Sequence, residues 1–479
     1  MKENNIFEAM SFIDSELIEK ADETPKKTEK NSYVSKKRRK ITWISSAAAA
    51  MVAIVLSIVI IVNSGGNTIL TSYAISTPTY PQMSRYPSLY NSEEYNNWHN
   101  DIKKQWKYYN AGDNLDEFFI KSIQAILLEV ADSNAVYSPV NIYMALSMLA
   151  EISSGETRKQ ILDILGSESI EELRTQAYSV WNACYRNDGL TDSRIANSVW
   201  LNQNVQYNGS TVNTLSSQYY ASVFQGDMGS QKYSECYREW MKKETGGLLD
   251  DMINELSFDK YTTVALASTL YFETNWHSKF DKKDNSKRIF HTVDKDVECD
   301  FMNTSYIGDY YYGNHFSSVC KRLENDGEMY MILPDEGVSV SELLTDEEVL
   351  SFLFTQWEWE KQATCNINLA LPKFDISMKK EISSDLTEMG ITDCFDSQKA
   401  DLTKLFSNGG NTYLQKAEHG ARIIVDENGC KGSAYTSLMD AGASFPDETV
   451  DFTLDRPFIF VVTSPDGLPL FIGVVNQPV

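Results

Sequence analysis

The feature that most constrains this chain is a segment near its C-terminus, residues 427–460, which begins with side chains of alternating size. Successive residues of a β-strand point to opposite faces. One face carries only small side chains, from Cys430, Gly432, Ala434 and Thr436. The other face includes a charge and a large ring, from Lys431, Ser433, Tyr435 and Ser437. A half-buried strand normally turns Val, Ile or Leu inward, so this pattern predicts a strand that enters a crowded place.

Ordered blocks elsewhere in the chain resemble those of one known family. They are SPVNI (138–142), GETRKQI (155–161), ANSVW (196–200), TGGLL (245–249), LPDEG (333–337), LPKF (371–374), DRPFIF (455–460) and PLFIGVVN (469–476). Their order resembles that of the serpins, over residues 114–479, and the chain is identified as a bacterial-type member. The resemblance implies a domain with three β-sheets, eight or nine helices and an exposed reactive-centre loop.

Hydrophobic periodicity predicts the same α+β class. Residues 115–130 and 141–152 have the pattern of helices, and residues 450–454 and 458–463 that of strands. The last of these is almost entirely apolar, which predicts burial on both faces. Helices and strands are mixed without regular alternation, which favours α+β over a doubly wound sheet.

The N-terminal region has a different organisation. Residues 1–40 are polar and end in the basic run KKRRK, and residues 41–62 are 22 residues without a charge. Such a run is long enough to span a bilayer as a helix. The basic flank predicts a cytoplasmic tail at 1–40, a signal anchor at 41–62 and an extracellular remainder. The alternative is a cleaved signal peptide, which would give a secreted protein.

Residues 63–113 separate this anchor from the serpin-like domain. They are rich in Tyr, Ser, Pro and Asn and show no sustained apolar period. This composition favours an extracellular linker or stalk. Alternatively, their many aromatic side chains could pack on the domain.

Composition excludes several classes of function. The net charge of −24 argues against a nucleic-acid partner, because phosphate binding needs clustered Lys and Arg. The seven cysteines lack metal-ligand spacing and are expected to be isolated thiols. The motifs GxSxG, HExxH and GxGxxG and a Walker loop are absent from the sequence. We therefore expect no enzyme, no cofactor and no metal.

The resemblance implies suicide inhibition of an extracellular serine protease by a monomer. The protease would attack the loop and form a covalent acyl-enzyme complex, and the cut loop would insert into the main sheet. The residues implied for the loop hinge are Glu427, Gly429, Cys430, Gly432, Ala434 and Thr436. The metastable uncut fold would drive this insertion, and distortion of the protease would then stop deacylation.

Family spacing places the reactive bond at Ala443-Ser444, fourteen residues after Gly429. The methyl group of Ala443 favours elastase-like or subtilisin-like proteases, because it suits a shallow apolar pocket. A bond one residue earlier is an alternative, whereas Phe445-Pro446 is disfavoured by the proline. An ordinary surface loop with no target, or a cysteine protease as target, also fits this sequence.

The family also has residues beneath the main sheet that control its opening. They map to the shutter, Ser138, Asn141, Ser268 and His419, and to Trp276 at the breach, where insertion starts. Asn and Ser appear exchanged between two shutter positions, an exchange that could preserve a donor–acceptor pair to His419. His419 and Trp276 could instead be ordinary core residues.

Two loop residues depart from the family pattern. Tyr435 is large but lies on the face expected in solvent, so its cost should be minor. Asp440 lies on the face to be buried, where an unpaired carboxylate is costly. The alternative functions are therefore a non-inhibitory serpin that acts as a binding module at the cell surface, or a display scaffold.

Overall fold

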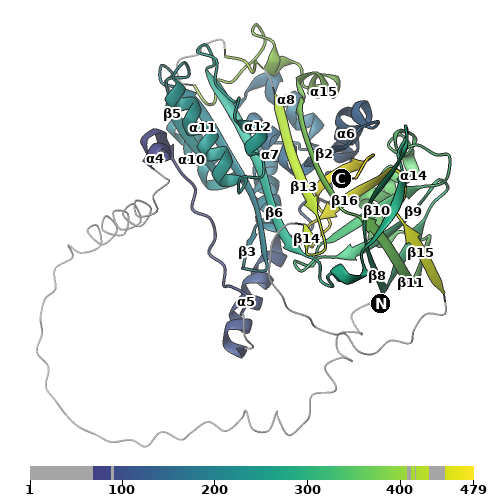
Figure 1. Cartoon of the computed structure of the whole chain (residues 1–479). Coiled ribbons are helices and arrows are strands. Elements are labelled where there is room, and N and C mark those ends of the chain that lie inside the picture. The colour runs from purple at the N-terminus through teal and green to yellow at the C-terminus, as the bar shows by residue number, and fades with distance from the viewer. Residues whose placement is uncertain (1–67, 88–90, 407–411, 416, 431–447, 479) are drawn as a thin grey trace, which may run out of the picture. The chain divides into compact units, whose positions relative to one another are not determined.

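The structure of the protein is a computed structural model that describes residues 68–87, 91–406, 412–415, 417–430 and 448–478. Residues 66–479 form one compact unit. In its described part, helices surround two β-sheets (Figure 1). The helices are α4 (Thr68–Tyr73), α5 (Ser92–Gln105), α6 (Asp116–Leu127), α7 (Pro139–Ile152), α8 (Gly155–Ile164), α9 (Ile170–Cys184), α10 (Gly209–Gln218), α11 (Gln231–Glu244), α12 (Asp250–Ile253), α13 (Val340–Leu343), α14 (Glu347–Thr355) and α15 (Ser383–Glu388).

The first sheet carries the loop hinge. Its strands in spatial order are β1 (Ala74–Ser76), β5 (Ala221–Gly226), β4 (Thr191–Asn202), β6 (Val264–Asn275), β14 (Gly429–Cys430), β13 (Glu418–Val425) and β12 (Phe374–Glu381), with β3 (Arg186–Asn187) paired to β4. In the described part of the chain, the two residues of β14 are all that lies between β6 and β13. The sheet is therefore joined at the hinge end of these two strands.

The second sheet forms much of the core. Its strands in spatial order are β15 (Thr449–Thr453), β11 (Gln362–Pro372), β8 (Asp296–Tyr312), β9 (Phe316–Arg322), β10 (Glu328–Pro334), β16 (Phe458–Thr463), β17 (Pro469–Val475) and β2 (Ala135–Tyr137), with β7 (Ser286–His291) paired to β8. Every residue of β16 is buried, as its apolar sequence predicts. The strand predicted at 450–454 is β15.

The number of sheets differs from the three that the resemblance implies. The long strand β8 accounts for the difference, because it has different partners along its length. It pairs with β7 and β11 over most of its residues and with β9 at its end, where Tyr310 lies opposite Val319. The described strands therefore form two continuous hydrogen-bonded sheets.

Helix α7 connects the two sheets through the core. Ser138 caps its N-terminus by accepting a hydrogen bond from the backbone N–H of Asn141, and Pro139 occupies the first turn. Thirteen of its fourteen residues are buried, and it packs against β6 and β17. The predicted helix 141–152 lies within α7, and the one predicted at 115–130 is α6 followed by a 3-10 turn.

Residues 68–87 and 91–112, expected to belong to a stalk, pack on the domain instead. Strand β1 pairs with β5 and so extends the edge of the first sheet. Tyr80 packs in tilted contacts among the rings of Trp181, Tyr185 and Tyr220. None of the described helices is long and apolar enough to cross a membrane. The anchor expected at 41–62 lies outside the described residues.

Candidate functional site

The hinge glycine lies where only glycine fits. Gly429 and Cys430 pair with Asn275 and Thr274 of β6, and Cys430 also pairs with Val425 of β13. A Cβ added to Gly429 would lie 2.3 Å from the carbonyl oxygen of Thr274 and 2.5 Å from the Cα of Asn275. Because both contacts are with backbone, no side-chain movement could relieve them. Gly429 thus lets the chain enter the sheet between β6 and β13.

The breach residue Trp276 holds the backbone just before this glycine. Its indole Nε1 donates to the carbonyl oxygen of Asp426 at 2.8 Å, and its backbone N–H donates to Asn428 at 2.9 Å. The backbone N–H of Phe280 donates to the carbonyl of Glu427 at 3.2 Å. Three consecutive carbonyl groups are thereby bound by one short segment. Trp276 lies where a hinge would have to be held closed or released.

The side chain of Glu427 fixes the hinge to the residue between β11 and β12 and to the residue before β7. Its Oε1 lies 2.5 Å from Lys373 Nζ and 2.5 Å from Asn285 Nδ2. Burial by itself would raise the pKa of Glu427, but the hydrogen bonds from Lys373, from the backbone and from Asn285, together with the charge of Lys373, outweigh burial and hold the pKa below its usual value. Glu427 is therefore a charged anchor at neutral pH.

The shutter lies beneath the other half of the gap between β6 and β13. His419, on β13, accepts a hydrogen bond at Nε2 from the backbone N–H of Ser138 at 3.2 Å. Burial lowers the pKa of His419 to about 4, so the ring is neutral at pH 7. This bond ties the sheet to the start of helix α7.

The expected donor–acceptor pair between His419 and the exchanged residues is not formed in this state. The Oδ1 of Asn141 and the Oγ of Ser268 are buried without a hydrogen-bond partner in the described chain. The partner of the ring is Ser138, because the N-capping turn of α7 aims its backbone N–H at the imidazole. Two buried polar atoms thus remain available beneath the sheet.

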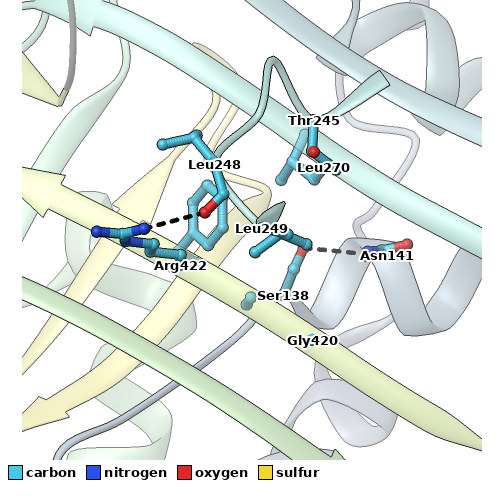
Figure 2. A pocket seen from close by; sticks show the side chains of 10 residues that line it. Ser138, Asn141, Thr245, Leu248, Leu249, Leu270, Gly420 and Arg422 are labelled. Carbon is cyan, nitrogen blue, oxygen red and sulfur yellow. Dashed lines mark hydrogen bonds between the residues drawn. The ribbon is translucent and has the colours of Figure 1, made fainter. Parts of the chain in front are cut away.

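The gap between β6 and β13 contains two small cavities. One, of about 10 Å³, is lined by residues of α7, β6, β13 and the segment after α11, including Ser138, Asn141, Leu270 and Gly420 (Figure 2). The other, of about 10 Å³, includes Cys430 in its lining. Each has room for roughly one water molecule. A further strand could therefore enter only if β6 and β13 move apart.

The segment between α11 and α12, here called the lid, contributes Leu248 to the lining of both cavities and Leu249 to that of the first. Arg422 of β13 donates to the carbonyl of Leu248 at 3.2 Å (Figure 2). Arg422 also holds Asp375 of β12 in a two-pronged ion pair, at 2.8 and 2.6 Å. Arg422 thus links β12, β13 and the segment that carries Leu248.

His419 makes the stability of the fold depend on pH. The folded ring has a pKa of about 4 and the unfolded ring one of about 6.5, so only the unfolded chain binds a proton between these values. Stability is thus expected to fall as pH falls from 7 to 4, by up to about 3 kcal/mol. Urea unfolding should show this loss in the wild type and a smaller one in His419→Gln, which does not titrate. Equal losses in both proteins would contradict the assignment.

The structure brings the predicted hinge and breach residues together at one end of the gap, and the shutter at the other. Gly432, Ala434, Thr436 and the reactive bond Ala443-Ser444 lie outside the described residues. Sequence reasoning missed Lys373 and Arg422. Lys373 belongs to the LPKF block that carries the resemblance, whereas Arg422 is the one charge in the apolar run at 421–425 and could have been noticed there.

The arrangement of hinge, shutter and lid agrees with the family that the sequence resembles. Comparison with known proteins tests this resemblance. Residues 113–478 match the family described as "Serpin (serine protease inhibitor)". The chain belongs to the serpin family. Serpin-ZX of Arabidopsis thaliana is 29% identical over 365 residues, which are 72% of this chain and 93% of that protein. Plasminogen activator inhibitor 1 of Bos taurus is 26% identical, over 76% of this chain and 91% of that protein.

A solved serpin has the same fold. The crystal structure of a thermophilic serpin, tengpin, in the native state superposes with a TM-score of 0.69 at 24% identity, over 84% of this chain and 97% of tengpin. The family is described as an inhibitor of serine proteases, a description that names no catalytic activity of its own. This serpin thus belongs to a class that takes an enzyme as its partner.

Proposed function

We propose that this serpin is a suicide inhibitor of serine proteases that traps the acyl-enzyme by inserting its cut loop between β6 and β13. The register of β14 carries the proposal. Cys430 lies opposite Thr274 on β6 and opposite Val425 on β13. Continued along both strands, this antiparallel register brings the small-residue face of the hinge past the large side chains of β6. Gly432 would pass Phe272 and Ala434 would pass Leu270.

The same register gives the shutter a partner. Thr436 would lie between Ser268 on β6 and His419 on β13. The buried Oγ of Ser268 has no partner in the described chain, and a threonine hydroxyl can both donate and accept. A buried polar atom that gains a hydrogen bond stabilises the state in which it does so, by about 1 kcal/mol or more. Insertion would therefore complete the shutter.

The chemistry belongs to the protease. Its serine Oγ bonds to the carbonyl carbon of Ala443, the bond from Ala443 to Ser444 breaks, and the Ser444 amine leaves with a proton from the catalytic histidine of the protease. Insertion of the new chain end then competes with attack of water on the ester. The serpin supplies the scissile bond and the free energy of insertion.

The finer features of the function rest on sequence alone. Ala443 supports specificity for elastase-like or subtilisin-like enzymes, because its methyl group suits a shallow apolar pocket. The uncharged run at 41–62 and its basic flank support a single-pass anchor with the domain extracellular. The proposal also states that this serpin is of the bacterial type and acts as a monomer.

A gel experiment with residues 67–479 tests the proposal. The protein is mixed with pancreatic elastase or subtilisin, and the products are followed by denaturing gel, melting temperature and the mass of the released peptide. Inhibition predicts a heat-stable covalent complex and a peptide that starts at Ser444. Cleavage without a complex but with a large rise in melting temperature would indicate insertion that is too slow for that protease. Cleavage with no rise would contradict inhibition and support the non-inhibitory alternative.

Asp440 is expected to make trapping less efficient. The register of β14, extended along β6, would place it opposite Val264 at the far end of β6, where a carboxylate must be buried late in insertion. Asp440→Ala should therefore lower the number of inhibitor molecules consumed per protease by at least about twofold. Titration of protease activity measures this number. Met439→Ala, on the opposite face, is the control, and an equal effect of both changes would contradict the register.

A further inference from the structure

A lysine is buried behind the breach without a counter-ion. Lys321 lies on β9 and is 4% exposed. In the described part of the chain, its ammonium group makes no hydrogen bond or ion pair. Its Nζ lies 4.8 Å from the ring centre of Phe280, 5.2 Å from that of Tyr306 and 5.7 Å from that of Trp276. Lysine is almost never buried without a partner, so this position needs an explanation.

Packing alone does not explain the residue. The neighbouring Val319 and Met329, which lies opposite Lys321 on β10, are fully buried, and an apolar side chain would suit position 321 as well. The three rings attract the cation through their negative faces and offset part of the cost of burying it. They supply no negative charge, however. The closed breach therefore contains a cation whose loss of hydration is only partly compensated.

Two of the three rings belong to the segment that binds the hinge. Trp276 binds the carbonyl groups of Asp426 and Asn428, and Phe280 binds that of Glu427. The two rings pack edge to face at 5.8 Å. When this segment releases the hinge, the rings can move apart and water can reach the ammonium. Hydration of Lys321 is thus coupled to opening of the breach.

We propose that Lys321 is a positioning residue that sets how readily the breach opens, because its buried charge destabilises the closed state. The inference deepens the proposed function, since a hinge that opens easily favours fast insertion. It concerns the uncut protein alone, however, and it can be tested without any protease.

The buried ammonium group of Lys321 makes opening of the breach depend on pH. Burial lowers its pKa to about 8 and is the one cause of the shift. Ionisable groups on the packed elements are Tyr306 of β8, Cys320 and Arg322 of β9, Glu328 and Tyr330 of β10, His277 and Lys279 beside Trp276, and Asp426 and Glu427 of the hinge segment. The open breach would restore the ordinary pKa of about 10.4. Opening then takes up a proton between these values, so it becomes harder as pH rises from 7 to 9.

Cys430 reports breach opening. It is 1% exposed and is covered by the pairing of β14 with β6 and β13, so alkylation by iodoacetamide requires the hinge to open. The full-length chain is treated with the reagent, and mass spectrometry follows the peptide that contains Cys430. The peptide with buried Cys394 serves as an internal reference for global unfolding.

Three proteins are compared: the wild type, Lys321→Met, which removes the charge, and Lys321→Arg, which keeps it at every pH used. At pH 7 we expect wild type and Lys321→Arg to label at Cys430 at least about tenfold faster than Lys321→Met. At pH 9 the ratio of wild type to Lys321→Met should be about tenfold lower than at pH 7, because the closed state has then lost its proton while the open state keeps it, whereas the ratio for Lys321→Arg should not change. Dividing each labelling rate by that of Lys321→Met at the same pH removes the effect of pH on thiol reactivity.

One labelling result would contradict the proposal. If Lys321→Met labels as fast as the wild type or faster at pH 7, the charge holds the breach closed or has no effect, and the proposal is wrong. Should Lys321→Met fail to fold, the pH profile of the wild type divided by that of Lys321→Arg carries the same test. If the protein forms no covalent complex with a protease but shows these labelling ratios, the proposed function is wrong and the role of Lys321 still holds.

Discussion

Thr436→Arg is expected to convert this serpin from an inhibitor into a substrate. In the register of β14, residue 436 would enter the sheet between Ser268 and His419, and His419 is buried and neutral at pH 7. An unpaired guanidinium there costs several kcal/mol. Each 1.4 kcal/mol changes a rate ratio about tenfold, so hydrolysis of the acyl-enzyme should overtake insertion by about 100-fold. A denaturing gel should show cleaved serpin, free protease and almost no covalent complex.

The neighbouring residue provides the control. Tyr435→Arg places the same charge one position earlier, on the face that remains in solvent after insertion. This variant should retain at least half of the covalent complex and an unchanged cleavage site. If both variants lose the complex equally, the arginine acts through loop recognition by the protease and the register is wrong. If neither does, the loop does not insert as far as the shutter.

Some features of the site can be predicted from short stretches of sequence. The small-residue face from Cys430 to Thr436 is read from strand periodicity alone, because alternate residues of a strand lie on the same side; beyond Cys430 it stays a prediction, since residues 431–447 lie outside the described residues. Helix α7 is similar, since Ser138 and Pro139 are a capping residue and a first-turn residue in the places where helices begin. Such features need no knowledge of distant segments.

Contacts between distant segments are less predictable. Glu427 is followed by turn-forming residues in the sequence, and nothing local indicates that it pairs with Lys373 across the domain. In the shutter, the residue types suggested a pair to His419 from Asn141 or Ser268, yet the donor is a backbone N–H of Ser138. Residue types limit which bonds can form, but the tertiary packing selects the atoms that meet.

The segment before the domain shows the same limitation. Its Tyr, Pro and Ser content has the composition of a linker, and composition carries no information about available partners. Tyr80 packs against Trp181, Tyr185 and Tyr220, which lie between 101 and 140 residues further along the chain. A segment without a core of its own can thus be fixed by an aromatic surface that another part of the chain presents.

The second large effect concerns the choice of target. Ala443→Arg is expected to abolish inhibition of elastase-like enzymes and to create inhibition of trypsin-like ones, with a change in relative rate of at least about 100-fold. An arginine side chain is too large for a shallow apolar pocket, whereas it pairs with the carboxylate at the base of a deep acidic one. Association rates with pancreatic elastase and with trypsin, measured by progress curves for both proteins, give the comparison.

The change of target requires the arginine to lie directly before the reactive bond. The matched control is therefore Gly442→Arg, which places the same side chain one residue earlier. If the reactive bond is Ala443-Ser444, Gly442→Arg should not give rapid trypsin inhibition, and the peptide released from Ala443→Arg should start at Ser444. If Gly442→Arg is the better trypsin inhibitor, the bond lies one residue earlier. Insertion from Gly429 would then bring one residue fewer into the sheet before the ester is reached. Trypsin that cuts Ala443→Arg without being trapped would show that the loop is recognised but that insertion is slower than deacylation.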